Sequence, residues 1–115
     1  MDSILNSIKK MLGLAEDYDA FDTDIVILIN GALMILQQLG VGEVGFSITD
    51  SSATWDSFTE HRSDIEAIKT YVYLKVKMAF DPPANSTVLK AYEDSCKELE
   101  WRLNVQVDEG VGFNE

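Results

Sequence analysis

The sequence contains one cysteine, one histidine and two prolines. A single cysteine excludes a disulfide within the chain and is compatible with a reducing compartment. One cysteine and one histidine cannot supply the ligands of a structural zinc site, so we expect no metal or other cofactor. Cys96 falls on the apolar stripe of a predicted helix without a base nearby, and we interpret it as a core residue. His61 fits a solvated position near a helix start better than a catalytic one.

Signatures of phosphate binding, calcium binding and catalysis are also missing. Gly40, Gly42 and Gly45 are not followed by the Lys-Ser/Thr pair of a phosphate-binding loop. The acids between residues 17 and 24 lack the glycine and the final glutamate of a calcium loop, and helix capping explains them better. No nucleophile, base and oxyanion donor can be assembled from the sequence. We therefore predict that the protein is not an enzyme.

Positive charge is scarce, with nine Lys and Arg against twenty Asp and Glu and a net charge of −11. Only the segment 61–80 has more bases than acids, and its bases are Arg62, Lys69, Lys75 and Lys77. A free-standing nucleic-acid-binding protein needs a cationic surface, which this composition does not provide. We expect these four bases to lie at the edges of an amphipathic helix, with their aliphatic stems packed along it.

Long apolar runs are absent as well. The longest, residues 25–39, is interrupted by Asn30, Gly31, Gln37 and Gln38, so it is too short and too polar to span a bilayer. No signal peptide is expected at the N-terminus. With 115 residues, 46% of them hydrophobic, the chain has the composition of a single folded domain. We expect a soluble protein without a membrane partner.

Apolar residues at helical spacing predict a short N-terminal helix and three main helices. Their approximate ranges are 4–12, 22–39, 63–80 and 86–103, with a short helical turn just before the third. Expected capping residues are Asp2, Asp22 or Thr23, Ser57, Ser63, and Asn85 or Ser86. In the second helix Ile27, Leu28 and Ile35 widen the apolar stripe, which indicates a central helix buried on more than one side.

Between the second and third helices the apolar period changes to two. Residues 46–55 alternate around the turn signal Asp50-Ser51-Ser52, which predicts a β-hairpin. A lone hairpin is marginal in water, so Phe46 and Trp55 must pack on the helices or on a partner. The predicted fold is thus a small, mainly α-helical bundle with a β-hairpin inserted between its second and third helices.

The last segment, 105–115, alternates briefly and contains two glycines, which indicates an extended C-terminal tail after a helical domain of residues 1–104. Its apolar residues Val105, Val107, Val111 and Phe113 suit docking on a partner, for example as an added strand. A tail that folds back on its own subunit is the alternative.

Two sets of apolar residues lie outside the predicted core stripes. Trp101 is roughly 160–200° from Leu99 and Leu103 at about 100° per residue, so it covers a second core layer or anchors an interface. Tyr71, Leu74 and Met78 form a second stripe on the 63–80 helix. This spare apolar surface favours self-association.

The chain resembles the head–tail connector proteins of tailed bacteriophages. The segments that carry the resemblance are Ile4–Leu14, Tyr18–Ile25, Leu39–Gly42, Ala53–Trp55, Tyr71–Lys77, Phe80–Pro83 and Glu100–Asn104. The Asp-Pro-Pro turn at 81–83, between an aromatic helix end and a helix that closes on Trp101-Arg102, is the best single marker.

The resemblance implies a homo-oligomeric ring in the virion, commonly twelve-fold, at the head–tail interface. One side of the ring would meet the portal protein and the other a head-closure or tail-completion protein, with DNA passing through without specific binding. Assembly would take place in the host cytoplasm. An acidic channel wall repels phosphates, and bases paired across subunits would limit the self-repulsion of the ring.

We expect the interface residues to be Phe46, Trp55, Arg62, Lys69, Tyr71, Lys75, Lys77, Trp101, Val105, Val107, Val111 and Phe113. Two other functions stay open. A DNA mimic predicts acids in one regular stripe, whereas here they are scattered along the sequence. A generic helical interaction module, such as a toxin-neutralising partner, would differ in not assembling with itself.

Overall fold

The computed structural model describes residues 3–59 and 64–113, with side chains described as far as Val105. These residues form five helices: α1 (Ile4–Met11), α2 (Asp22–Gln38), α3 (Trp55–Thr59), α4 (Ile65–Phe80) and α5 (Ser86–Phe113). The prediction of a mainly helical chain is confirmed. None of the helices in the described part is long and apolar enough to cross a membrane.

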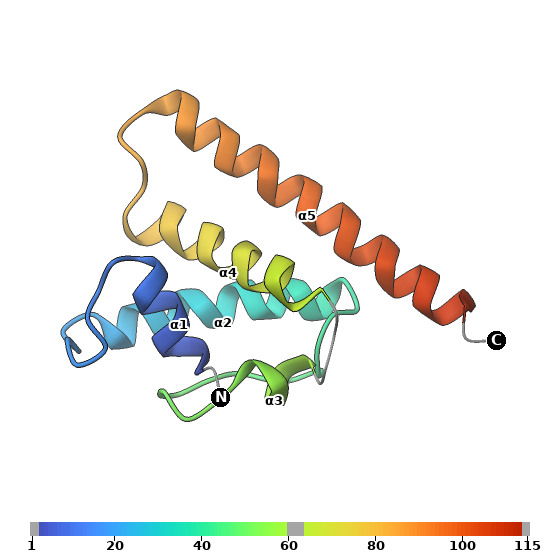
Figure 1. Ribbon diagram of the computed structural model, residues 1–115, viewed down its shortest axis with the longest axis horizontal. Helices are drawn as coiled ribbons and strands as arrows, with labels where there is room; N and C mark the ends of the chain where they lie inside the picture. Colours follow the sequence, from blue (N-terminus) through green and yellow to red (C-terminus); the bar gives the residue numbers. More distant parts are fainter. Residues whose placement is uncertain (1–2, 60–63, 114–115) are drawn as a thin grey trace.

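Helix α4 is the centre of the structure, because it packs on α1, α2 and α5 (Figure 1). Its buried side chains face all three of these neighbours and include Ile68, Tyr71, Val72, Leu74 and Val76. Asp81 ends the helix immediately before Pro82 and Pro83, as the sequence predicts, since a residue before proline avoids helical dihedral angles. The Pro-Pro turn reverses the chain and lays α5 along α4.

Local sequence explains where α1 and α2 begin and end. Ser3 caps α1, its hydroxyl accepting a hydrogen bond from the Asn6 N–H at 3.2 Å, in place of the predicted Asp2. The first turn of α2 contains Asp22 and Asp24, which suit the positive end of the helix dipole. Phe21 occupies the cap position without a side-chain hydrogen bond, so the predicted cap at Asp22 or Thr23 is wrong. At the other end of α2, Gly40 adopts a positive φ of 89° and closes the helix.

The buried face of α2 carries the predicted stripe of apolar residues, from Ile25 to Leu36. The expectation that this helix is buried on more than one side is wrong, because Ile27 is 62% exposed. Helix α5 covers α4 rather than α2, so among the described elements one face of α2 has no helix packed against it (Figure 1).

The β-hairpin predicted for residues 46–55 is wrong. Within residues 3–59 and 64–113 there is no β-strand, and the only ladder contact is an isolated bridge between Ser3 and Thr54. The segment runs instead as an irregular loop along α2 and then enters α3. Thr54 caps α3, with its hydroxyl 3.3 Å from the Ser57 N–H, so α3 begins earlier than the Ser57 cap predicts.

Two amide side chains of α2 replace the missing partner strand. The Asn30 side chain donates to the Ile48 carbonyl at 2.9 Å and accepts from the Ile48 N–H at 2.8 Å. Two helical turns further on, Gln37 donates to the Phe46 carbonyl at 2.9 Å and accepts from the Gly45 N–H at 2.8 Å. Each amide thus satisfies backbone groups as a neighbouring strand would, and this fixes the loop against the helix.

The loop then places two aromatic residues in the core. Trp55 is buried and its indole N–H donates to the Ser7 hydroxyl at 3.2 Å, joining α3 to α1. Phe58 is also buried, and its ring centroid lies 5.2 Å from that of Phe46. Phe46 and Trp55 therefore pack on the helices of their own subunit.

Helix α5 is the outermost element. It has 28 residues and is about 42 Å long, against about 24 Å for α4. Its end projects beyond the other helices (Figure 1). Asn85 caps it, as predicted, by accepting from the N–H groups of Thr87 and Val88 at 2.8 and 3.2 Å. The helix continues to Phe113, so the expectation of an extended conformation for residues 105–113 is wrong; the division into a domain and a tail stays a prediction.

Removing the Asn30 amide should destabilise the fold. In Asn30→Ala the N–H and carbonyl of the buried Ile48 lose their partners, so we expect the free energy of unfolding to fall by about 2–3 kcal/mol. Denaturant titration followed by circular dichroism measures this. Gln38→Ala, at an exposed position of the same helix, should change the value by less than about 0.5 kcal/mol. Equal effects of the two substitutions would contradict the role given to Asn30.

Gly42 should be less replaceable than Gly45. Both have φ near +84°, but a Cβ at Gly42 would overlap the Phe58 ring, whereas Gly45 has open space around it. Left-handed backbone alone costs about 1–2 kcal/mol for alanine. We expect Gly45→Ala to lose about that much and Gly42→Ala to lose about 1–3 kcal/mol more through overpacking. Thermal melts of the two variants, compared with the unmodified protein, test the difference.

Candidate assembly surfaces

The described side chains offer no constellation for catalysis or for metal binding. No group of three or more His, Cys, Asp and Glu residues converges in this part of the chain. Cys96 is buried, as predicted, and its burial raises the pKa of the thiol, which keeps it protonated and unreactive. The buried charged and polar groups Lys9 and Tyr71 are bonded to other parts of the fold.

The buried Lys9 is a structural residue. It is 1% exposed, and its Nζ lies 2.9 Å from Asp22 Oδ1 and donates to the Glu16 carbonyl at 2.9 Å. One ammonium group thereby joins α1, the turn after it and the start of α2. A buried charge needs such partners, because leaving it unpaired costs several kcal/mol, on the order of 3–5.

A hydrogen bond inside the bundle fixes α5 on α4. The Tyr71 side chain is fully buried, and its hydroxyl donates to Glu100 Oε2 at 2.7 Å. Burial, followed by the hydrogen bond to Glu100, raises the pKa of Tyr71. The rest of the α4–α5 contact is a narrow apolar seam, with members at alternating spacings of four and three: Tyr92, Cys96, Leu99 and Leu103.

The first exposed apolar surface is the α2/α4 groove, which has a volume of about 500 Å³. It is lined by Ile27, Leu28, Gly31, Ala32, Met34, Ile35, Lys75, Met78 and Ala79. Ile27 is 62% exposed and Met34 is 56% exposed, which is unusual for large apolar side chains in the middle of a helix. Gly31 between them leaves room over the helix backbone. Lys75 is the one charged residue of the lining.

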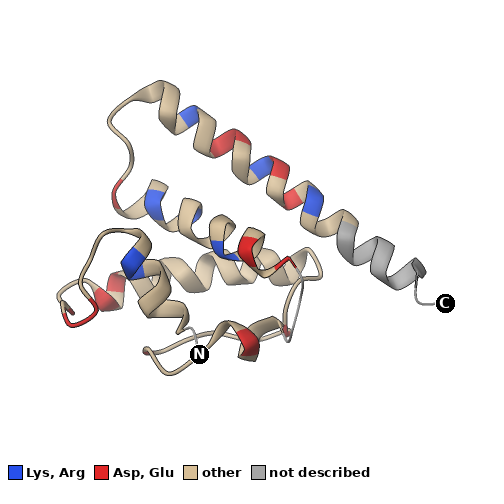
Figure 2. Ribbon diagram, viewed as in Figure 1, with Lys and Arg blue, Asp and Glu red and all other residues tan. Residues whose placement is uncertain are grey.

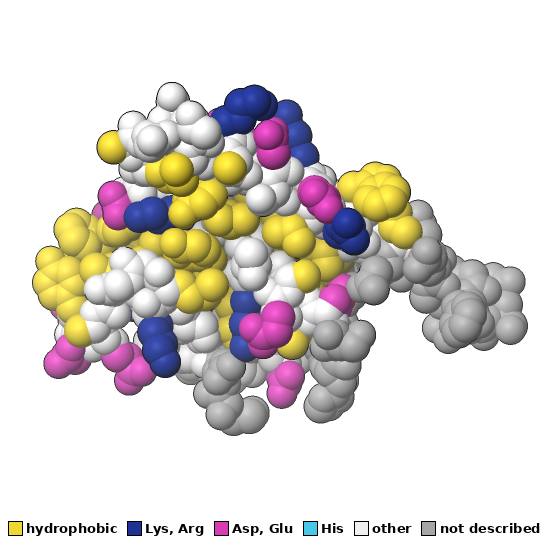
Figure 3. All heavy atoms as spheres, turned by 45° about the horizontal axis from the view of Figure 1, so that its top comes forward, with side chains coloured by type: hydrophobic (Ala, Val, Ile, Leu, Met, Phe, Trp, Pro, Cys, Tyr) yellow, Lys and Arg dark blue, Asp and Glu magenta, His cyan; other side chains and the backbone are white. Residues whose placement is uncertain are grey.

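The second surface is the outer face of α5, which we define by Asp94, Glu98, Trp101 and Val105. These positions follow each other at i, i+4, i+7 and i+11, so they lie along one strip of the helix. Trp101 is 65% exposed, which excludes the second core layer considered for it. Beside the strip, a hollow of about 420 Å³ lies between α5 and the start of α4, next to Asp64 and Arg102. Figure 3 shows the α5 side of the molecule, where hydrophobic side chains form a band flanked by charges of both signs.

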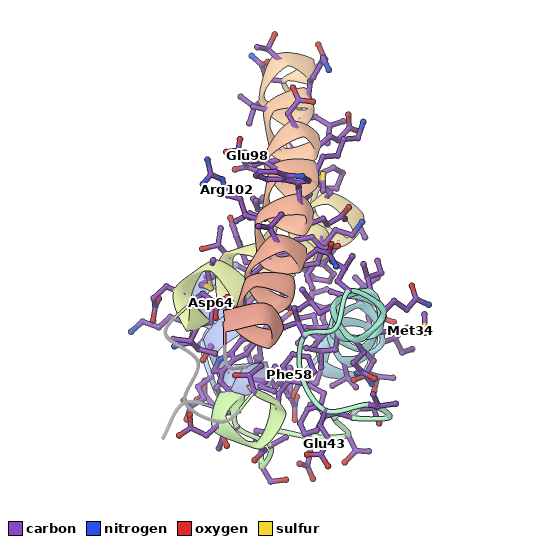
Figure 4. The ribbon with its side chains drawn as sticks, turned by 90° about the vertical axis from the view of Figure 1, so that its right-hand side faces the viewer. Met34, Glu43, Phe58, Asp64, Glu98 and Arg102 are labelled. Atoms are coloured by element: carbon purple, nitrogen blue, oxygen red, sulfur yellow. The ribbon has the colours of Figure 1, made fainter. Side chains whose placement is uncertain are left out.

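The two surfaces lie on opposite sides of the subunit. In the view of Figure 4, Met34 points outward on one side of the molecule, whereas Glu98 and Arg102 point outward from α5 on the other. Met34 of the groove and Glu98 of the outer face of α5 therefore point in different directions from one subunit.

Acidic residues are spread over several elements. They occur in the turn before α2, on α3 and along α5, while Lys and Arg occur on α1, α4 and α5 (Figure 2). A DNA mimic requires its acids in one regular stripe, and the acids of the described residues do not form one.

A family model described as phage connector protein matches residues 4–110, which is nearly the whole chain. The chain belongs to the phage connector protein family. No curated protein and no solved structure matches it. Connector proteins are structural components of the virion and assemble with other phage proteins, so the family agrees with a function that depends on surfaces rather than on an active site.

The structure of this connector separates the predicted interface residues into groups. Phe46, Trp55 and Tyr71 serve the core of their own subunit. Trp101 is exposed, and Val105 is half-buried near it. Arg62, and the side chains of Val107, Val111 and Phe113, lie outside the described residues.

The predicted bases on α4 differ in whether they already have a partner within the subunit. Lys77 lies 2.9 Å from Asp81, and Lys69 lies 3.5 Å from Glu66. Lys75 has no acidic group within 4 Å in the part of the chain that the structure describes. Among the described bases of α4, Lys75 is thus the one without an acidic group within 4 Å.

Sequence reasoning missed Ile27 and Met34. It assigned Ile27 to a buried second face of the helix and did not single out Met34. The available signal was the width of the apolar arc of residues 22–38, which is larger than a bundle of this size can cover. An apolar arc wider than the bundle can cover is explained either by a central helix or by an interface.

The connector should lose stability above pH 10 in part because of Tyr71. A raised pKa in the folded state means that the neutral phenol stabilises the fold below pH 10 and that this stabilisation is lost as the pH rises further. Tyr71→Phe removes the hydrogen bond to Glu100, so we expect a loss of about 1–2 kcal/mol at pH 8 and a shallower decline between pH 9 and 11. Denaturant titrations across this range measure both effects. Tyr18→Phe, at an exposed position, is the control and should follow the unmodified protein.

Proposed function

We propose that this connector is a head–tail adaptor of a tailed phage, which forms a homo-oligomeric ring below the portal protein. DNA passes through the ring, and a head-closure or tail-completion protein binds the side opposite the portal. The resemblance of the sequence gives twelve as the number of subunits in the virion. The placement of two exposed apolar surfaces on opposite sides of one subunit is the observation that carries the ring.

Opposite surfaces support a ring for a geometric reason. A contact between two different surfaces of identical subunits repeats from copy to copy, and it forms a closed ring when the rotation per subunit divides a full turn. A contact between identical surfaces would stop at a dimer. The long α5, which projects beyond the bundle, gives the subunit a further element for contact with the portal or with a neighbour.

The charge of the subunit supports passage of DNA. A ring of subunits with a net charge of −11 each repels the phosphate backbone, so DNA is not retained in the channel. The described bases are mostly paired with acids of the same subunit, as Lys77 and Lys90 show, and this leaves no continuous cationic track.

Native mass spectrometry of the connector, alone at raised concentration and mixed with its portal protein, tests this proposal. We expect a closed ring in at least one condition, because Ile27, Met34 and Trp101 are exposed in the subunit and assembly would bury them. The free protein can stay monomeric if the portal templates the ring. The portal protein alone is the control for its own oligomers. A connector that remains strictly monomeric in both conditions would contradict the ring.

A further inference from the structure

We propose that the α2/α4 groove of one copy binds the outer face of α5 of the next copy, with Trp101 as the anchor and Lys75 facing Glu98. This inference rests on the proposed ring and specifies which surfaces of the subunit form it. The occupant of the groove is thus a second copy of the same chain.

The groove has the properties of a binding site for a large apolar side chain. Its walls carry Ile27, Met34 and Met78, and methionine side chains adapt their shape to a partner. Gly31 contributes no side chain, and nothing in the subunit lies within 4 Å of a Cβ built there. A bulky ring can therefore approach the backbone of α2 closely at this position.

The outer face of α5 has the complementary properties. Tryptophan is the residue type most often found as an interface anchor, and Trp101 projects from the helix with 65% of its surface exposed. Asp94 and Glu98 precede it along the same strip and supply carboxylates, and Asp94 lies 3.3 Å from Lys90 in an exposed ion pair. Glu98 pairs with Arg102 at 2.8 Å, but both side chains are more than half exposed, so this ion pair contributes little and can rearrange.

Charge complementarity selects the pairing of these two surfaces. The groove has a single charge, on Lys75, which has no acidic partner within 4 Å among the described residues. The strip around Trp101 supplies carboxylates. Pairing Lys75 with Glu98 of the next copy would give the free base a partner and reduce repulsion between acidic subunits.

A subunit cannot fill its own groove with its own Trp101. The seam through Cys96 and Leu103 holds α5 on α4, and Trp101 lies about half a turn away from this seam at about 100° per residue. The groove and the outer face also point in opposite directions (Figure 4). Every copy therefore has one groove and one outer face to offer to neighbours, and a closed ring leaves neither unpaired.

The test uses two variants that each block one side of the contact. Met34→Asp places a charge in the groove and leaves the outer face of α5 intact, whereas Trp101→Ala removes the anchor and leaves the groove intact. Both are assayed by native mass spectrometry in the condition in which the unmodified connector forms rings. Each variant alone should fail to form rings, with the midpoint of assembly moved to a concentration at least about thirtyfold higher. Because both positions are exposed, the melting temperature of the monomer should change by less than about 2 °C.

Mixing the two variants gives the decisive result. One intact groove and one intact outer face remain in the mixture, so we expect a dimer of one copy of each variant and no larger species. A second pair of variants tests the charges: Lys75→Glu and Glu98→Lys should each weaken assembly, and the protein with both substitutions should recover it at least in part. Val44→Asp, at a loop position that is 87% exposed and outside both surfaces, is the matched control and should assemble normally.

Other outcomes would overturn the inference, and each would show which part of it is wrong. Rings formed by either blocked variant, or a mixture that stays monomeric, would show that neighbours meet through other surfaces while the ring itself stands. Normal rings of Trp101→Ala that no longer bind the portal would assign the outer face of α5 to the portal instead. A connector that forms no ring without substitutions, with or without the portal, would contradict the proposed function as well.

Discussion

This small fold depends on one constraint. The backbone groups of a long irregular loop need hydrogen-bond partners, and no β-sheet supplies them. Residues 40–54 connect two helices and cross the bundle, and unpaired backbone groups there would destabilise it. Asn30 and Gln37, two turns apart on α2, supply the hydrogen bonds. Once the loop is fixed, Trp55 and Phe58 enter the core and α1 is held against α3.

The same constraint explains which part of the fold follows from the sequence. Helical spacing and the prolines at 82 and 83 predict α2 and α4 to within a residue or two, because these signals are local. The alternation in residues 46–55 is equally local, but a strand needs a partner that the chain does not provide. The partner is a pair of amides, Asn30 and Gln37, which in the sequence look like polar interruptions of an apolar run. A tertiary contact thus overrides the local pattern.

The candidate surfaces divide in a similar way. Trp101 is recognisable from the sequence, because an aromatic residue opposite the seam of a helix has either a second layer to cover or a partner to bind. Ile27 and Met34 cannot be recognised as exposed from the sequence. An apolar residue on a broad apolar stripe is expected to be buried unless the packing of the other helices is known. The decisive fact is the position of α5, which covers α4 and leaves α2 open. Only the packing of the helices, which no local pattern encodes, shows that the face is free.

The acidity of the subunit and its assembly make opposing demands. A net charge of −11 would suit the proposed channel, which DNA must pass without retention, but the same charge on every copy would resist closure of the proposed ring. Apolar contact alone can offset this repulsion, yet it does not select one neighbour orientation over another. A single unpaired base at an apolar groove, opposite a helix face with carboxylates around a tryptophan, provides both attraction and orientation. In the ring that we propose, Lys75 would therefore be the residue that orients one acidic subunit on the next.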